Sequence, residues 1–299
     1  MKILISGSSG LVGSALIPFF EQRHHEVYKL VRKAPHVSYR EIFWDSDQGV
    51  VDPMLLEGVD AVIHLAAESI MGRWSDHKKD RIKESRVKGT RLLCLALSQL
   101  KTPPSVLIVA SAIGYYGDCQ GGIRDEQSPK GSGFLSDVCQ EWEEATQIAA
   151  KRGIRVINLR IGMVLSPLGG ALKQMLPIFK LGLGGKIGTG DQMVSWISID
   201  DLVRAIDFII HDKTLAGPLN AVTPFPVTNK QMTTMLGKLL HRPTWLTIPA
   251  FMVKIMFGQL GKEVLLSSVD VQPKKLERAG FAYLYPSLED FLKTLLSRK

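Results

Sequence analysis

Cysteine is scarce in this chain: its 299 residues include three, Cys94, Cys119 and Cys139. An odd number of cysteines without paired spacing is atypical of a disulfide framework and of a metal site. The chain also has no apolar run near the roughly 18 residues that a membrane span requires, and its first residues are typical of a core strand rather than a signal peptide. We therefore expect a cytoplasmic protein with no structural disulfide, no metal and no membrane partner.

Acidic residues are also few. Asp and Glu total 29 against 37 Lys and Arg, which gives a net charge of +8. This excess allows an anionic partner, but it also fits a solvated basic face. The densest basic stretch, Lys78 to Arg91, includes Asp80 and Glu84 and is typical of an exposed helix. Because the sequence has no row of stacking aromatics and no dense basic groove, we do not expect a nucleic acid as the partner.

The first thirteen residues, MKILISGSSGLVG, combine a strand, a glycine turn and the start of a helix. Ile3–Ile5 is a short apolar run, typical of a strand buried on both faces of a parallel sheet. Glycines at three-residue spacing allow a tight turn and a close approach of the backbone to a pyrophosphate, and the helix N-terminus offers free N–H groups. The stretch therefore predicts a dinucleotide site made by Gly7, Ser8, Ser9, Gly10, Leu11, Val12 and Gly13.

Strand-like and helical runs alternate through the first half of the chain. The expected strands are Ile3–Ser6, Glu26–Val31, Ala61–Leu65, Val106–Ala110 and Val156–Leu159. The expected helices are Leu11–Arg23, which contains Pro18, and about Ser75–Leu100 and Phe134–Arg152. This βαβ alternation predicts an α/β fold with a Rossmann-type doubly wound parallel sheet.

The rhythm changes from Ser166, where glycine-rich loops and isolated helices take over. We expect residues 1–165 to form the dinucleotide-binding domain, with a segment of about 191–222 returning to it. Residues 166–299 are expected to form a smaller substrate region over the carboxyl ends of the strands, where sheets of this kind bind ligands.

The end of the second strand predicts which dinucleotide is bound. A carboxylate there accepts from the ribose 2′-hydroxyl of NAD, whereas an arginine accommodates the 2′-phosphate of NADP. Here the sequence reads Lys29-Leu30-Val31-Arg32-Lys33, without a carboxylate. We therefore predict NADP, with Arg32 as the main phosphate contact and Lys33 as its helper. The alternative is a basic surface pair that merely ends a strand.

Three further motifs carry a family resemblance: HLAAES at 64–69, ASAIGYYGD at 110–118 and SWISIDDLVRAI at 195–206. With the glycine turn, they make the chain resemble the extended short-chain dehydrogenase/reductase superfamily. Within it, the chain is similar to the subgroup called epimerase family proteins, relatives of nucleoside-diphosphate-sugar epimerases. The additional motifs are ESRVKGT at 84–90, CQEWE at 139–143, LRIGMVLSPLGGAL at 159–172, LGLGGKIGTGDQMVSWI at 181–197, GPLNAVTPFPVTN at 217–229, and a carboxyl-terminal block at 267–292.

This resemblance covers essentially the whole chain and implies an NADP(H)-binding oxidoreductase or epimerase-like enzyme with a small substrate domain. It places Leu65, Ala66 and Ala67 along the cofactor. Arg86 stands where many relatives have Asn, beside the cofactor. The substrate is a small molecule, such as a nucleotide sugar, that the resemblance does not name. Relatives often pair through the two long helices, which allows a homodimer.

The chain departs from the superfamily at the catalytic pair. Members use a Tyr, with a Lys four residues later on the same helix face, to move a proton. Here Phe134 and Val138 stand at that spacing, and the helix contains no Tyr. The usual Ser is also displaced, because Ala112 falls in its slot while Ser111 is adjacent.

Three explanations are open. Other groups near the nicotinamide end can carry the proton, or the protein binds NADP(H) without turnover as a redox sensor, or it is an RNA-binding protein on the same fold. Each candidate group also has a structural reading, as a packing tyrosine, a small buried thiol or a loop cap. The candidates are Ser111, Tyr115, Tyr116, Cys139 and Glu68.

An anionic substrate would need cations and glycine-rich backbone near the cleft. The sequence offers Arg160, Lys186 and the loop Gly184–Gly190, with Arg73 and Arg86 opposite. Trp74 and Trp196 are candidates for stacking on a ring, although buried tryptophans are commonly core residues. Asp200 and Asp201 are expected to stabilise the N-terminus of the following helix.

Overall fold

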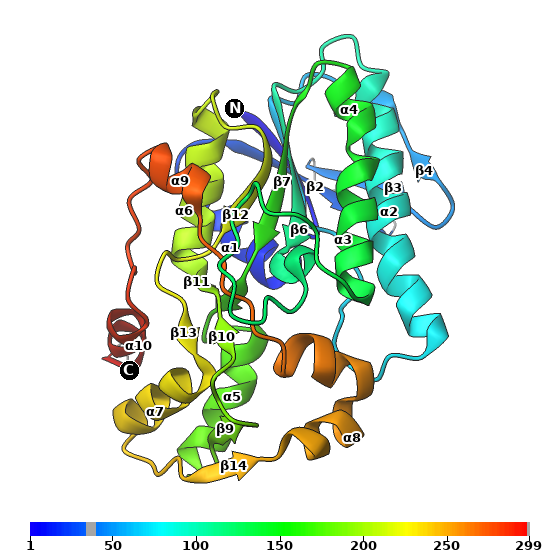
Figure 1. Ribbon diagram of the computed structural model, residues 1–299. Helices are drawn as coiled ribbons and strands as arrows, with labels where there is room; N and C mark the ends of the chain where they lie inside the picture. The colour runs from blue at the N-terminus through cyan, green and yellow to red at the C-terminus, as the bar shows by residue number, and fades with distance from the viewer. Residues whose placement is uncertain (34–39, 298–299) are drawn as a thin grey trace.

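The computed structural model describes residues 1–33 and 40–297, and its centre is one eight-stranded sheet (Figure 1). The strand order is β12-β7-β6-β5-β1-β2-β3-β4, and every neighbouring pair is parallel except β3–β4. The strands are β1 Lys2–Ser6, β2 Glu26–Val31, β3 Glu41–Asp45, β4 Val50–Val51, β5 Ala61–His64, β6 Val106–Ala112, β7 Arg155–Ile161 and β12 Gly217–Ala221. The predicted doubly wound α/β fold is confirmed.

Helices cover both faces of this sheet, as Figure 1 shows. On one face lie α1 Leu11–Glu21 and α6 Ile199–His211; on the other lie α2 Asp76–Ser98, α3 Phe134–Ala145 and α4 Gln147–Lys151. The central strands are buried throughout, because apolar side chains on both of their faces pack against helices. Short helical turns, η1 Pro53–Leu56 and η2 Ile113–Tyr116, follow β4 and β6.

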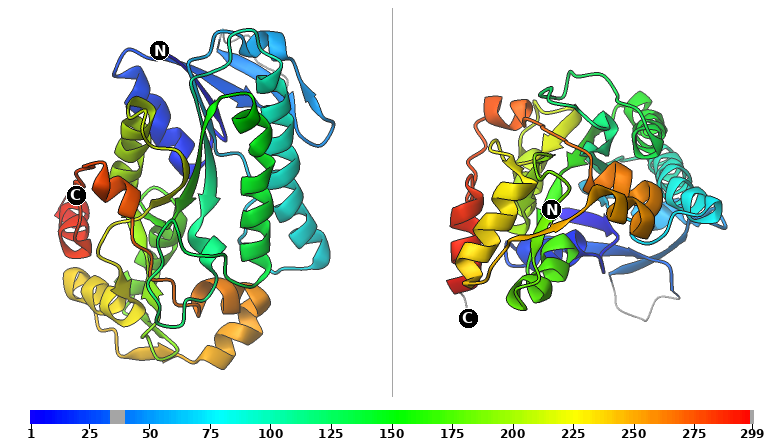
Figure 2. Two further views of the ribbon diagram at one scale, coloured as in Figure 1. Left: turned by 45° about the horizontal axis from the view of Figure 1, so that its top comes forward. Right: turned by 60° about the horizontal axis from the view of Figure 1, so that its bottom comes forward.

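The remaining elements form a lower lobe beneath the carboxyl ends of the strands (Figures 1 and 2). Its helices are α5 Gly170–Lys180, α7 Asn229–Leu240, α8 Ala250–Leu260 and α10 Leu288–Ser297, with a π-helical turn η3 at Gly261–Leu265. It also contains three two-stranded pairs: β8 Met163–Leu165 with β11 Trp196–Ser198, β9 Gly185–Ile187 with β14 Leu246–Ile248, and β10 Met193–Val194 with β13 Val227–Thr228. Helix α9 Lys274–Arg278 packs beside β12.

Two sequence expectations differ from the structure. The helix expected over Phe134–Arg152 is divided at Thr146, whose hydroxyl donates to the carbonyl of Glu143 at 2.7 Å, a local bond that competes with the helical pattern. Strands β3 and β4, which lie between Val31 and Ala61, were not expected from the sequence. Pro18 does lie inside α1, where it is exposed, and the helix continues past it with Gln22 N–H donating to its carbonyl.

No helix within residues 1–33 and 40–297 is both long and apolar enough to cross a bilayer.

Candidate functional site

The glycine turn between β1 and α1 leaves no room for side chains at two of its positions. Gly7 has a φ of +70°, and a Cβ there would lie 2.8 Å from the carbonyl carbon of Leu65. A Cβ on Gly13 would lie 2.3 Å from the carbonyl oxygen of Gly7. The turn therefore lies against the loop that follows β5, and α1 packs directly onto the turn, as a dinucleotide site requires.

The N-terminus of α1 is open to a ligand. Gly10 is its N-cap residue, and no side chain caps the helix there. The first-turn N–H groups of a helix need partners and favour an anion. Ser8, Leu11 and Val12 are half-buried and Ser9 is exposed, so the turn presents mainly backbone. The sequence prediction for residues 7–13 thus falls on a cradle of suitable shape for a pyrophosphate.

The loop after β5 forms the neighbouring wall, and Ser6 holds it in place. The Ser6 hydroxyl accepts from the N–H groups of Leu65 at 3.0 Å and Ala66 at 3.2 Å. It also lies 2.6 Å from Nδ1 of His64, so it donates to that nitrogen and the ring proton lies on Nε2. Ala67 follows and is exposed. Sequence reasoning missed Ser6 and His64, which have no ligand-binding signature of their own.

His64 is fully buried, and burial lowers its pKa to about 4. The ring is therefore neutral at pH 7. Its Nε2 has no hydrogen-bond partner in the described part of the chain, and the ring meets Trp44 edge-on with 5.6 Å between centroids. The neutral imidazole therefore connects β5 to β1 through its hydrogen bond with Ser6.

Arg32 and Lys33 follow β2 directly and are exposed. Strand β2 lies parallel to β1 with Leu30 opposite Ser6, so both cations emerge at the same edge of the sheet as the glycine turn. This is the place at which a dinucleotide fold contacts the adenosine ribose.

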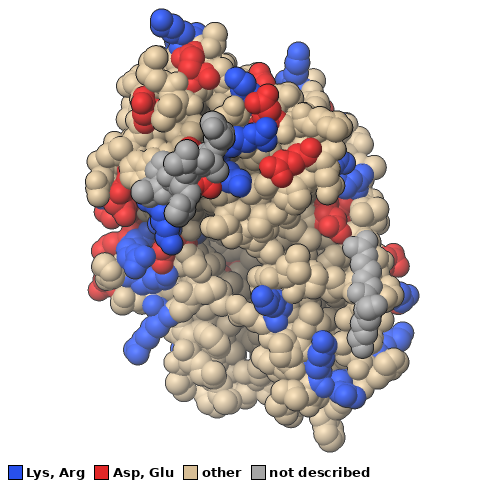
Figure 3. Space-filling view, turned by 180° about the vertical axis from the view of Figure 1, so that it is seen from behind, with Lys and Arg blue, Asp and Glu red and all other residues tan. Residues whose placement is uncertain are grey.

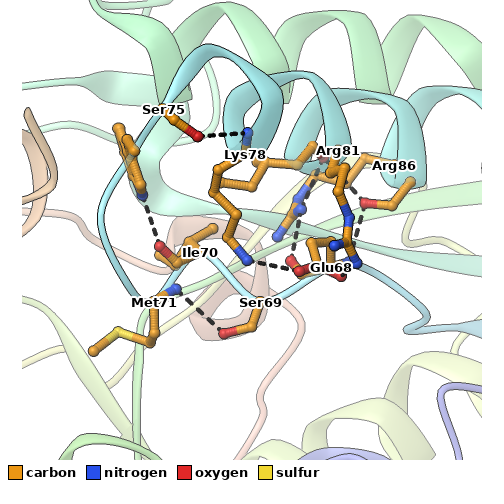
Figure 4. A network of polar contacts seen from close by, with 11 residues as sticks. Glu68, Ser69, Ile70, Met71, Ser75, Lys78, Arg81 and Arg86 are labelled. Atoms are coloured by element: carbon orange, nitrogen blue, oxygen red, sulfur yellow. Dashed lines mark hydrogen bonds and ion pairs between the residues drawn. The ribbon is translucent and has the colours of Figure 1, made fainter.

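Glu68 is the centre of a polar cluster that joins the loop after β5 to α2 (Figure 4). Its carboxylate pairs with Lys78 at 2.6 Å and with Arg81 at 3.0 Å. The bond from Lys78, more than any other contact, lowers the pKa of Glu68 below its ordinary value. Arg86 donates to the Glu68 carbonyl at 3.0 Å and to the Ile82 carbonyl at 2.9 Å. Glu68 therefore anchors this loop to α2 through its ion pairs.

The guanidinium of Arg86 is largely enclosed, which lowers its pKa. It lies 5.1 Å from the centroid of the Trp142 ring, and no carboxylate pairs with it within residues 1–33 and 40–297. Cys139 is close enough to interact with its charge. An enclosed cation that carbonyls alone satisfy retains capacity for a further acceptor.

A buried network of polar side chains lies under the ends of β6 and β7. Glu143 binds Arg160 through both oxygens at 2.8 Å, and Ser111 donates to the same carboxylate at 2.7 Å. Arg160 also donates to the Tyr116 hydroxyl at 2.9 Å, which in turn donates to Asn220 at 2.7 Å. Burial raises the pKa of Tyr116 to about 12. Glu143 connects the network, and no functional role was expected for it from the sequence.

The other predicted catalytic groups lie around this network. Cys139 is buried, and burial, followed by the charge of Glu143, raises the pKa of its thiol to about 11. Tyr115 is half-buried, with its ring centroid 3.5 Å from the guanidinium carbon of Arg160. No bond to its hydroxyl is found within the described residues, whereas Ser111 and Tyr116 both have engaged hydroxyls.

Several expectations for the substrate side were wrong. Arg160 is 3% exposed and bound to Glu143, so it is not free to hold a phosphate. Trp196 is fully buried in the core of the lower lobe and cannot stack on a ligand. Trp74 is 9% exposed, packs on Phe134 and donates to the Ile70 carbonyl. The expectation for Asp200 and Asp201 is met, since both lie in the first turn of α6 behind the N-cap Ser198. The buried Asp201 carboxylate also accepts from two backbone N–H groups, those of Leu284 and Tyr285.

Lys186 and Arg73 retain accessible positions. Lys186 is half-buried in β9 and donates to the Thr189 carbonyl at 3.2 Å, and Arg73 is exposed in the loop before α2. Seen from behind, the molecule is hollowed between the sheet domain and the lower lobe (Figure 3).

Comparisons with known proteins agree with this geometry. The model of the NAD-dependent epimerase/dehydratase family matches residues 3–220, and a domain of unknown function, DUF1731, matches residues 248–295. Epimerase family protein Mb2239 of Mycobacterium bovis is 42% identical over 97% of this chain and 96% of its own length.

Two solved structures are similar over almost the whole chain. That of human epimerase family protein SDR39U1 (isoform 2) with NADPH has 31% identity and a TM-score of 0.91, covering 100% of both chains. That of the nucleoside-diphosphate sugar epimerase from Corynebacterium glutamicum has 35% identity and a TM-score of 0.81, covering 98% of this chain and 57% of that one.

Proposed function

The chain belongs to the NAD-dependent epimerase/dehydratase family, and we propose that within it the protein is an NADP(H)-dependent oxidoreductase or epimerase-like enzyme acting on a small anionic substrate. The observation that carries this proposal is the cradle at residues 7–13. At two glycines there, a Cβ would collide with neighbouring backbone atoms, and the adjoining helix has no side-chain cap. These features fit a pyrophosphate and have no evident purpose in a closed structural turn.

The choice of NADP rests on Arg32 and Lys33. Both are exposed beside the cradle, and the chain from Lys29 to Lys33 contains no carboxylate to accept a ribose hydroxyl. A guanidinium binds a phosphate through two parallel hydrogen bonds. The human relative whose structure contains NADPH, 31% identical to this chain, supports the same choice.

Bound nicotinamide would supply or accept the hydride, and the chain itself would move the proton. Among the predicted groups, Tyr115 is the best placed for this role. It follows β6 at the carboxyl edge of the sheet and is half-buried, while contact with Arg160 and a bond from Ser136 to its carbonyl hold the residue in position. Ser111 and Tyr116 would position Tyr115 through the Glu143–Arg160 network rather than act directly.

The substrate would bind in residues 166–299, over the carboxyl ends of the strands. Lys186 and Arg73 are the accessible cations on the two sides, and Arg86 has hydrogen-bonding capacity to spare. A sugar attached to a nucleoside diphosphate fits this charge. The C. glutamicum relative, named a nucleoside-diphosphate sugar epimerase, supports the same substrate class.

A non-catalytic NADP(H) sensor is the alternative, and Phe134 and Val138 favour it, since neither can hold a proton where the superfamily has its Tyr and Lys. Hydride transfer distinguishes the two. The purified protein is incubated with NADPH or NADP and a panel of nucleotide sugars, aldehydes and ketones, and nicotinamide absorbance and sugar epimers are followed. Turnover of any member that Tyr115→Phe abolishes supports the enzyme. If no member of the panel is turned over and NADPH still binds tightly, the protein is a sensor rather than an enzyme.

A further inference from the structure

The foot of the lower lobe carries an unusually exposed apolar surface. Trp245 is 83% exposed, Ile255 78%, Leu181 73%, and Phe251 63%. We call this surface the apolar foot; its residues are Leu181, Leu183, Trp245, Leu246, Ile248, Phe251, Met252, Ile255 and Met256. Single exposed apolar residues are ordinary on soluble proteins, but a group of nine on adjoining segments is not.

These residues belong to one continuous surface. The Arg242 guanidinium donates to the Lys180 carbonyl at 2.7 Å, which places the loop after α5 beside the residues before β14. Strand β14 pairs with β9, and α8 begins directly after it. Figures 1 and 2 show β14 running along the bottom of the lobe with α8 at its end.

Helix α8 is apolar on two sides, although one side faces solvent. Val253 and Leu260 are buried against the rest of the protein. Phe251, Met252, Ile255 and Met256 lie on the solvent side at the i, i+1, i+4, i+5 spacing of a single helix face. A helix that is hydrophobic all round is normally enclosed by protein or by lipid.

The segments that form the apolar foot carry charge of one sign. Residues 168–190 and 241–262 contain no Asp or Glu. Their exposed cations are Lys173, Lys180, Arg242, Lys254 and Lys262, whereas Lys186 is half-buried and is the cation proposed for the substrate. These cations favour an occupant that is negatively charged as well as apolar.

We propose that the apolar foot docks onto the surface of an anionic lipid bilayer. The aliphatic residues of α8 and β14 would enter the boundary between headgroups and acyl chains, with Trp245 at the interface and the surrounding cations against lipid phosphates. Pairing with a second copy is disfavoured, because a twofold contact would bring the five exposed cations of each copy together. The expectation of no membrane partner was based on the lack of a long apolar run, which docking of this kind does not need.

Trp245 provides the test. The other four tryptophans are at most 9% exposed, so Trp245 alone reports on events at the surface. The full chain is mixed with vesicles of phosphatidylcholine, with and without phosphatidylglycerol, and its emission is recorded with ordinary and brominated acyl chains. We expect a blue shift and quenching by bromine only when phosphatidylglycerol is present. No binding, or binding equal on both vesicles, would overturn the proposal.

Matched variants identify the surface by vesicle co-sedimentation. Lys254→Ala should weaken binding about fivefold, the loss expected for one cation near an anionic surface. Ile255→Ser should weaken it further, whereas Met54→Ser, an equally exposed apolar residue (76%) on η1, should not. NADPH affinity serves as the folding control. A dimer that Ile255→Ser dissociates, or capture of an acidic protein without vesicle binding, would refute the bilayer as the occupant.

Discussion

Glu143 and Arg160 form a two-point ion pair in which the side chains are only 12% and 3% exposed. The pair lies beneath the segment that carries Ser111, Tyr115 and Tyr116, and it contacts all three. Any role of these residues in catalysis therefore depends on one buried electrostatic support.

Breaking this pair should destabilise the fold strongly. In Glu143→Gln, Arg160 stays buried without its counter-charge, and we expect the free energy of unfolding to fall by about 3–5 kcal/mol. Glu84→Gln is the matched control, because Glu84 pairs with Lys88 on the surface and should cost less than about 1 kcal/mol. Urea denaturation measures both. Similar losses in the two variants would mean that the buried pair has no special role.

The glycine cradle predicts a sharp contrast between two Gly→Ala substitutions in helices. In Gly13→Ala the new methyl group would overlap the Gly7 carbonyl oxygen, so we expect NADPH binding to be lost and stability to fall by about 1–3 kcal/mol. Gly89→Ala in α2 meets nothing closer than 3.4 Å and should bind NADPH normally, with stability unchanged or up to about 1 kcal/mol higher. Calorimetric titration and thermal unfolding provide the measurements. Normal NADPH affinity in Gly13→Ala would place the dinucleotide elsewhere.

His64 predicts a loss of stability in mild acid. Its pKa is about 4 in the folded protein and 6.5 when unfolded, so below pH 6.5 the unfolded chain binds the extra proton. Stability from this group is complete above pH 6.5 and declines toward pH 4, by up to about 3 kcal/mol. In His64→Asn that slope should be reduced, whereas in His77→Asn, at an exposed position on α2, it should persist. Urea unfolding at a series of pH values measures the slope of the free energy of unfolding against pH. An unaltered slope in His64→Asn would show that another group is responsible.

The two adjacent tyrosines should behave differently. Tyr116→Phe removes a hydroxyl that bonds both Asn220 and Arg160, which should lower stability by about 1–3 kcal/mol. Tyr115→Phe should leave stability unchanged and reduce turnover by about 10²-fold or more, with NADPH affinity retained. Once a substrate is found, kcat and unfolding measurements on both variants decide. Full activity in Tyr115→Phe would exclude its hydroxyl as the proton carrier.

Sequence reasoning succeeded where the requirement is local. The spacing of Gly7, Gly10 and Gly13 after a buried strand predicted the turn, and the helix expected from Leu11 begins at that residue in the structure. The break at Thr146 was missed because a hydroxyl bond to Glu143 decides it, and a threonine within an apolar stripe gives no warning.

The candidate site was harder to predict because partners distant in sequence assemble it. Arg160 was expected to bind a phosphate. In the structure its guanidinium donates to Glu143 of α3 and to Tyr116 of η2 instead. Trp196 and Trp245 are indistinguishable by residue type, yet one is wholly buried and the other is 83% exposed. The burial of a tryptophan depends on tertiary packing, which the local sequence pattern does not predict.

The most direct test of the central claim compares the dissociation constants of NADPH and NADH for the wild type, Arg32→Ala and Lys213→Ala. Lys213 is an exposed cation after the distant end of α6 and serves as the control. The account predicts that the wild type prefers NADPH, that Arg32→Ala weakens NADPH alone by about ten- to a hundredfold, and that Lys213→Ala changes neither. Equal affinities in the wild type, or an undiminished NADPH preference in Arg32→Ala, would contradict it.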